Sequence, residues 1–98
     1  MAPSNQSVRR NLANSYLQGG HPKKSLKILE TLALESPELS IAHNSLGVAA
    51  HIIGDQPQSI LHFRDAIKCE PDFAGAHENL AQALLFEEEY EEAWAEFE

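Results

Sequence analysis

The chain of 98 residues has one cysteine and no long apolar run, and each shortage excludes a class of protein. Cys69 alone cannot form an internal disulfide or a cysteine cluster for zinc, so it favours a reducing compartment, and we expect the cytoplasm. The longest mostly apolar stretches, residues 46–54 and 80–86, are far too short to cross a bilayer. The N-terminal stretch MAPSNQSVRR has no apolar segment before a cleavage site, so we expect no secretory signal in it. We therefore expect neither a disulfide-stabilised secreted protein nor a membrane protein.

Positive charge is missing from the last quarter of the chain. Residues 74–98 hold eight glutamates and no lysine or arginine, whereas residues 1–39 hold five cations and three glutamates. The chain is thus mildly basic at its head and acidic at its tail, with a net charge of −8. Nucleic acid is a poor partner for such a molecule. The glutamates of residues 87–92 are typical of a solvated helix face.

What the sequence does contain is an internal repeat. The segment AHNSLG at residues 42–47 returns as AHENLA at residues 76–81, a shift of 34 residues. The same shift superimposes Leu12 on Leu46 and Leu80, and it also aligns small residues and two prolines along the chain. Such a period is the mark of a stacked helical repeat. We divide the chain, as one domain, into units 6–39, 40–73 and a truncated 74–98.

Each unit predicts two antiparallel helices joined by a short turn. In the second unit, Gly54 suits a left-handed helix cap, and Asp55 can accept from backbone amides of the next helix. Helices approach to about 8–10 Å only where side chains at the crossing are small. Small residues recur at two places in each unit, and large apolar ones close each pair. The small sets are Ala13, Gly47 and Ala81, with Ser25, Ser59 and Ala93; the large set is Leu29, Phe63 and Phe97.

This pattern resembles the tetratricopeptide repeat, a 34-residue helix–turn–helix unit. Its spaced residues are clearest in the second unit, as Leu46, Gly47, Gly54, Phe63, Ala66 and Pro71. The fourth residue of each unit departs from the family, which often has tryptophan where this chain has Arg9, His43 and His77. The resemblance implies an all-α, right-handed superhelical solenoid of about two and a half repeats. It also implies a concave surface that usually binds a peptide or another protein.

In such an array the first helix of each unit lines the concave groove. Periodicity places amides there, which donate and accept at once and suit the main chain of an extended peptide. The alternative is that they are merely solvated polar residues. Our candidate groove residues are Arg10, Asn11, Asn14, Asn44, Ser45, Asn79 and Gln82, with Arg10 for an acidic group. The same periodicity turns Ile41, Val48, Ile52 and Phe86 inward.

Some members of this family hold a C-terminal carboxylate with a clamp of basic residues and asparagines. Arg10 and Asn14 fit its first pair, but the third unit has no cation, and Glu78 would repel a carboxylate. We therefore expect no clamp of this kind.

The sequence carries no pattern typical of a catalytic or metal site. It lacks HExxH, paired Cys/His spacing, a glycine-rich phosphate loop and a supported catalytic triad. His43 and His77 occupy equivalent positions in adjacent units, so we expect their backbones to lie about 10 Å apart, too far to share a zinc ion. We expect them to fill the seam between units, His51 to lie near the groove end, and His21 and His62 to be exposed. The prediction is a protein that is not an enzyme and needs no metal or cofactor.

The chain stops inside the expected sixth helix, which carries Trp94 and Phe97. We expect this helix either to contact another molecule through these two residues, for example in a homo-oligomer, or to continue in a longer parent chain. Residues 89–98 also resemble repeats that lead into glycosyltransferase domains of bacterial proteins. Three hypotheses follow: a noncatalytic protein- or peptide-binding scaffold, the recognition arm of a larger transferase, and a self-assembly module with open ends.

Overall fold

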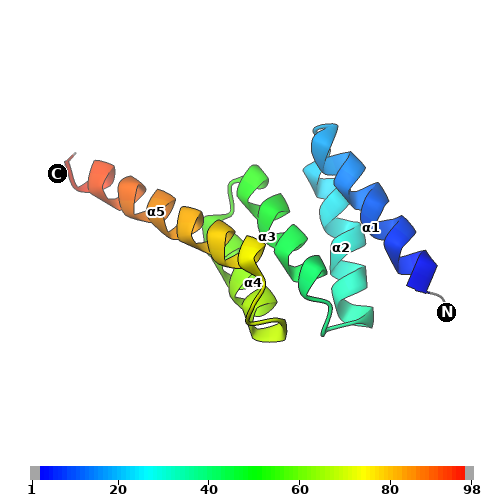
Figure 1. Ribbon diagram of the computed structural model, residues 1–98. Coiled ribbons are helices and arrows are strands. Elements are labelled where there is room, and N and C mark those ends of the chain that lie inside the picture. The colour runs from blue at the N-terminus through cyan, green and yellow to red at the C-terminus, as the bar shows by residue number, and fades with distance from the viewer. Residues whose placement is uncertain (1–2, 97–98) are drawn as a thin grey trace.

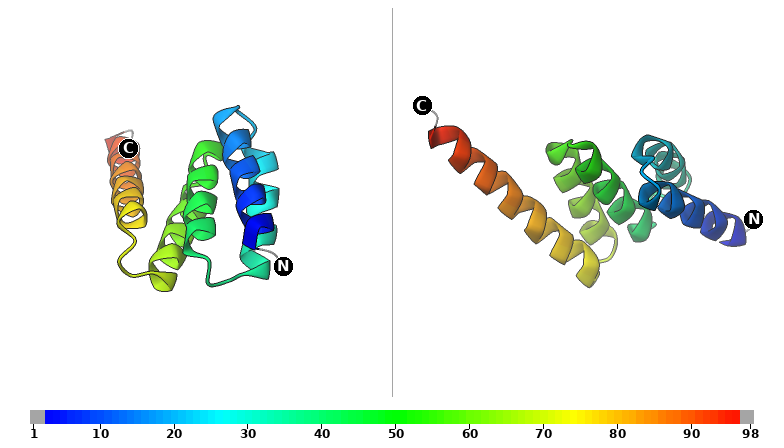
Figure 2. Two further views of the ribbon diagram at one scale, coloured as in Figure 1. Left: turned by 45° about the vertical axis from the view of Figure 1, so that its right-hand side comes forward. Right: turned by 90° about the horizontal axis from the view of Figure 1, so that it is seen from above.

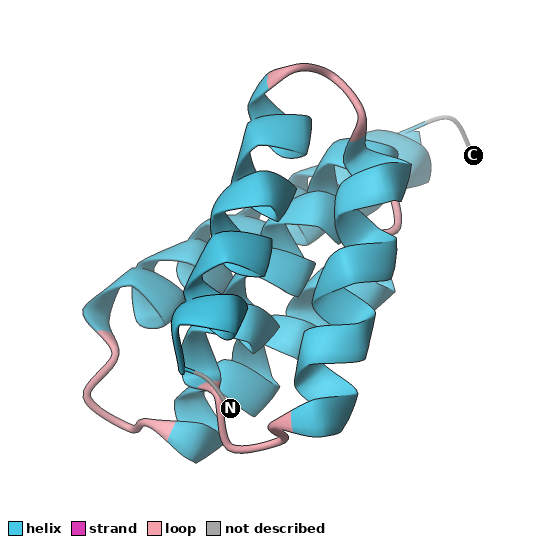
Figure 3. Ribbon diagram, turned by 90° about the vertical axis from the view of Figure 1, so that its right-hand side faces the viewer, coloured by secondary structure: helices cyan, strands magenta, loops and turns pink. Residues whose placement is uncertain are grey.

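The computed structural model describes the backbone of residues 3–96 and the side chains of residues 6–86. Within that range the chain is all helical, and the helices follow one another as antiparallel neighbours along an elongated body of 55 × 29 × 18 Å (Figure 1). Short loops join them (Figure 3). The helices are α1 (Pro3–Gln18), α2 (Pro22–Glu35), α3 (Ser40–Ile53), α4 (Gln56–Cys69) and α5 (Ala74–Glu96).

The turns within the first two helix pairs rest on Gly20 and Gly54, and the sequence predicts the left-handed cap at Gly54. Gly20 and Gly54 have φ of 84° and 99°, in the left-handed region where a side chain would clash with the backbone. After Gly54, the Asp55 side chain accepts a hydrogen bond of 3.4 Å from the Gln58 amide at the start of α4. The predicted helix cap is confirmed.

The crossing of α3 and α4 depends on one small and one large residue. Phe63 of α4 is buried against Gly47 of α3, and a Cβ added to Gly47 would lie 2.8 Å from Phe63 Cζ and closer still to two other ring carbons. Beside them the buried Ser59 hydroxyl donates a 2.9 Å hydrogen bond to the Gly47 carbonyl. The predicted small-against-large pairing is therefore confirmed at this crossing.

The main core lies between the first and second helix pairs. It is a buried cluster contributed by α1, α2 and α3, namely Ala13, Leu29, Leu32, Ala42 and Leu46. Leu46 is buried because the leucines of α2 pack on it. The repeat position that Leu12 shares with Leu46 predicts the same packing for both, and this prediction is wrong, since Leu12 is 46% exposed. The equivalent face of α1 has no preceding helix pair on it in the described part of the chain.

The third unit also differs from its prediction. α5 is a single helix from Ala74 to Glu96, so no turn separates a sixth helix (Figure 2, right). The reason lies in the sequence: Glu88 stands where the first two units have Gly20 and Gly54, and nothing near it favours a left-handed turn. Trp94 lies on α5 with its side chain outside the described side chains, and Phe97 lies outside the described residues altogether.

The histidines differ in part from what the sequence predicts. His62 is half-buried rather than exposed, and His77 is exposed rather than packed in a seam. His43 is half-buried and His21 is exposed, as expected. Among the described residues, no helix has both the length and the apolar character that crossing a bilayer requires.

Candidate peptide-binding groove

A cleft opens where α3 faces α5. Its polar lining comes from His51 of α3 and from Asn79 and Gln82 of α5. Its apolar lining comes from α3, α4 and α5 and consists of Val48, Phe63, Ala83 and Phe86. The cleft thus combines an apolar base with polar groups, as is usual for ligand sites.

Two predicted groove residues are joined across neighbouring helices. The Asn79 Nδ2 donates a 3.1 Å hydrogen bond to the Asn44 Oδ1, and both side chains are half-buried. This bond uses one donor of Asn79 and one acceptor site of Asn44. An amide has two donors and a two-lone-pair acceptor. The Asn44 Nδ2 and the Asn79 Oδ1 therefore keep hydrogen-bonding capacity for a ligand.

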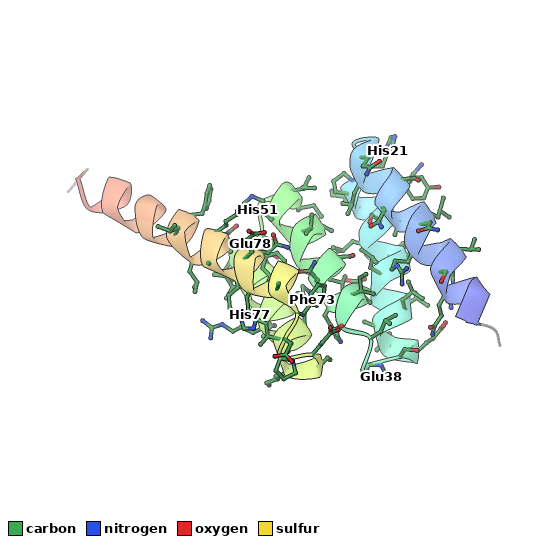
Figure 4. All side chains as sticks on the ribbon, in the orientation of Figure 1. His21, Glu38, His51, Phe73, His77 and Glu78 are labelled. Atoms are coloured by element: carbon green, nitrogen blue, oxygen red, sulfur yellow. The ribbon has the colours of Figure 1, made fainter. Side chains whose placement is uncertain are left out.

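A second polar chain fixes the orientation of His51. Gln56 Nε2 donates a 3.1 Å hydrogen bond to the Ala83 carbonyl, so Gln56 Oε1 is the atom that faces His51 Nδ1, at 3.0 Å. An amide oxygen only accepts, which means that Nδ1 carries the proton and Nε2 is an acceptor. The His51 ring also meets Phe86 of α5 edge to face, at 5.6 Å between centroids. His51 itself lies near the C-terminal end of α3 (Figure 4).

The structure brings some of the predicted groove residues together and leaves others apart. Asn79 and Gln82 line the cleft, and Asn44 reaches it through its bond to Asn79. The other four candidates do not line it: Arg10, Asn11 and Asn14 lie on α1, and Ser45 lies on α3. Of these four, only Asn11 is exposed.

Sequence periodicity also places Val48 and Phe86 inward, and both line the cleft. It did not assign Phe63 or Ala83 to the groove. Phe63 belongs to the second helix of its pair and was assigned to the crossing, which its ring also fills. The signal for this double role is Gly47, because the space left by its missing side chain holds part of the Phe63 ring, which also lines the cleft.

Comparison with known proteins places this geometry in a class. Residues 62–95 match the tetratricopeptide repeat family. Two solved structures superimpose on 90% and 95% of this chain, and the fold is the all-α tetratricopeptide fold. This agreement confirms the fold that the 34-residue period predicts.

The particular relatives are longer proteins. The TPR2AB domain of yeast Sti1, solved in complex with pHSP90, has a TM-score of 0.83 and 20% identity over 95% of this chain and 36% of its own. The MamA RS-1 ArsTM double mutant has a TM-score of 0.78 and 23% identity over 90% of this chain and 49% of its own. Protein FlbA of Caulobacter vibrioides is 30% identical over 96 residues, which are 98% of this chain and 16% of FlbA.

Proposed function

We propose that this chain is a noncatalytic scaffold that binds an extended peptide or protein segment in the cleft between α3 and α5. The observation that supports the proposal is the Asn44–Asn79 pair beside an apolar cleft wall. Main-chain amides and carbonyls of an extended ligand need donors and acceptors in alternation, and side-chain amides offer both.

The donors and acceptors that Asn44, Asn79 and His51 leave unused determine how the ligand main chain binds. Asn44 Nδ2 donates to a ligand carbonyl, while Asn79 Oδ1 and His51 Nε2 accept from ligand amides. Val48 and Phe86 contact an apolar ligand side chain that enters the cleft.

The charge of the chain sets the ligand polarity. Residues 74–98 carry eight glutamates and no cation, so the part of the ligand near α5 is neutral or basic. Arg10 on α1 is the partner for an acidic group further along the ligand.

The experiment is a selection followed by measured affinities. Random peptides displayed on phage are selected on the 98-residue chain, and the strongest binder is synthesised for calorimetry. Asn79→Ala and Gln82→Ala should each weaken binding by about fivefold or more, because a hydrogen bond contributes on the order of 1 kcal/mol. Lys68→Ala on α4, an exposed residue that does not line the cleft, is the matched control and should bind as the wild type does.

Two results would overturn the proposal. One is a selected peptide that binds all of these variants with equal affinity, which places its site elsewhere. The other is a selection that yields no binder of at least micromolar affinity. N-methylation of the ligand backbone at alternate positions should abolish binding if main-chain bonds are made, and it supplies an independent readout.

A specific observation favours self-association as a second candidate function. Val8 and Leu12 are 64% and 46% exposed, although their equivalents one repeat later, Ala42 and Leu46, are 0% and 2% exposed. A second copy that presents a helix to this face of α1 would bury it as α2 buries α3. The head of the chain is basic and its tail is acidic, so the head of one copy attracts the tail of another. Trp94 and Phe97 are the proposed contacts of that tail.

Sedimentation velocity at rising concentration, in low and high salt, tests this candidate. Association in low salt that Leu12→Ser weakens is expected. A monomer at all concentrations and both salts would exclude it. The third hypothesis, the recognition arm of a larger transferase, stays a prediction. Location in the cytoplasm likewise stays part of the proposal.

A further inference from the structure

A cluster of metal-ligating side chains lies away from the peptide cleft. His43 of α3 and His62 and Asp65 of α4 each place one potential ligand atom within 4.8 Å of the other two. Glu30 of α2 lines the same cavity, so three helices from two helix pairs converge there. Neither histidine nor either acid lines the cleft between α3 and α5.

The hydrogen bond of His43 leaves it in the form that binds metals. His43 Nε2 lies 2.8 Å from the Pro37 carbonyl oxygen, which only accepts, so Nε2 carries the proton. Nδ1 then has a free lone pair, and it is buried without a hydrogen-bond partner in the described part of the chain. A ring nitrogen that donates to a backbone carbonyl while its other nitrogen faces a metal is the usual arrangement of a histidine ligand.

His62 presents a similar nitrogen. Its Nδ1 is also buried and unpartnered among the described residues. Asp65 follows three residues later on the same face of α4 and supplies a carboxylate beside it.

We propose that His43, His62 and Asp65 bind a divalent transition-metal ion, for which Zn²⁺ is the best match. Two imidazoles and one carboxylate are a ligand set that zinc accepts, with bonds of about 2.0–2.2 Å. Tetrahedral bonds of that length put ligand atoms roughly 3.4 Å apart. Because the three atoms already lie within 4.8 Å of one another, metal binding requires any pair of them to approach by at most about 1.4 Å.

The fourth position is open to Glu30 or to water. A bound ion would join α3 to α4 and, through Glu30, the second helix pair to the first. This site is independent of the proposed peptide groove, so each can fail without the other.

Calorimetric titration of the chelator-treated 98-residue chain with Zn²⁺ tests the proposal. One ion per chain is expected. His62→Asn and Asp65→Asn should each weaken Zn²⁺ binding by about 100-fold, because removing even a residue that only supports a metal ligand costs about 10- to 100-fold in affinity. His77→Asn is the matched control. His77 makes the equivalent hydrogen bond, 2.7 Å from its Nε2 to the Pro71 carbonyl oxygen, but it lies outside the cluster.

A second readout keeps the test independent of folding defects. Zn²⁺ should raise the melting temperature of the wild type and of His77→Asn, but not of His62→Asn, whose helicity is checked by circular dichroism. If His62→Asn does not fold, Asp65→Asn carries the comparison. The proposal is overturned if the wild type does not bind Zn²⁺, if the cluster variants bind it as the wild type does, or if His77→Asn removes binding.

Discussion

Ser25 and Ser59 occupy the same place in successive helix pairs and differ in one hydrogen bond. Both are fully buried, but only the Ser59 hydroxyl has a partner in the described structure, the Gly47 carbonyl at 2.9 Å. We predict that Ser59→Ala lowers the free energy of unfolding by about 1 kcal/mol. Ser25→Ala should be neutral or slightly stabilising, because it removes an unpaired polar group. Urea unfolding of both variants checks this, and equal losses would contradict it.

Arg9 and Glu35 form the one salt bridge between described side chains. The guanidinium donates two hydrogen bonds, of 2.6 and 3.1 Å, to the carboxylate, and these bonds above all lower the pKa of Glu35. A lowered folded-state pKa stabilises the protein above the unfolded pKa, and the stabilisation is lost as the pH falls through the lowered value.

We therefore predict that Arg9→Gln raises the pKa of Glu35, as measured by NMR titration of its carboxyl carbon. The variant should also lose less stability than the wild type on acidification below about pH 4.5. Arg10→Gln, at the neighbouring cation, should leave the pKa of Glu35 unchanged. An unchanged pKa in Arg9→Gln would show that the salt bridge does not persist in solution.

At the scale of helices, the packing of α3 on α4 rests on the space beside Gly47. We predict that Gly47→Ala destabilises the protein by about 1–3 kcal/mol, since its Cβ would overlap the Phe63 ring. Phe63→Leu creates room but loses apolar contacts. The double variant should therefore lose less stability than the sum of the two single variants. Additive losses in chemical denaturation would show that the ring and the glycine do not meet.

The length of α5 is also decided at this scale. α2 and α4 follow turns built on Gly20 and Gly54, whereas Glu88 at the equivalent place lets α5 run on from Ala74 to Glu96. Exposed Leu85 and Phe86 lie just before that place. A helix that turned back there would cover them, as α4 covers α3.

At the scale of the whole molecule, burial is greatest in the middle of the array. The cluster of Leu29, Leu32 and Leu46 joins the first helix pair to the second, whereas α5 packs through one side on α4 and α3. We predict that backbone amides of α3 and the second half of α2 exchange with deuterium most slowly, and those of α5 after Ala83 fastest. Mass spectrometry of peptic fragments measures this, and equal exchange along the chain would contradict it.

Much of this protein could be predicted from the sequence, because its helices and turns depend on near neighbours. The structure confirms the helix pairs that the 34-residue period predicts. It also confirms three features that depend on contacts within one helix pair, namely the glycines at two turns, the cap at Asp55 and the small residue at Gly47. Periodicity likewise placed Asn79 and Gln82 on the face that lines the cleft.

What only the tertiary structure decided are contacts between residues distant in sequence. The Asn44–Asn79 bond spans 35 residues, and the cavity of His43, His62 and Glu30 joins three helices. Leu12 and Leu46 share a position in the repeat, yet only Leu46 has a neighbouring helix pair to bury it. A sequence pattern specifies which face of a helix is apolar, but the partner that covers that face depends on how the helices stack.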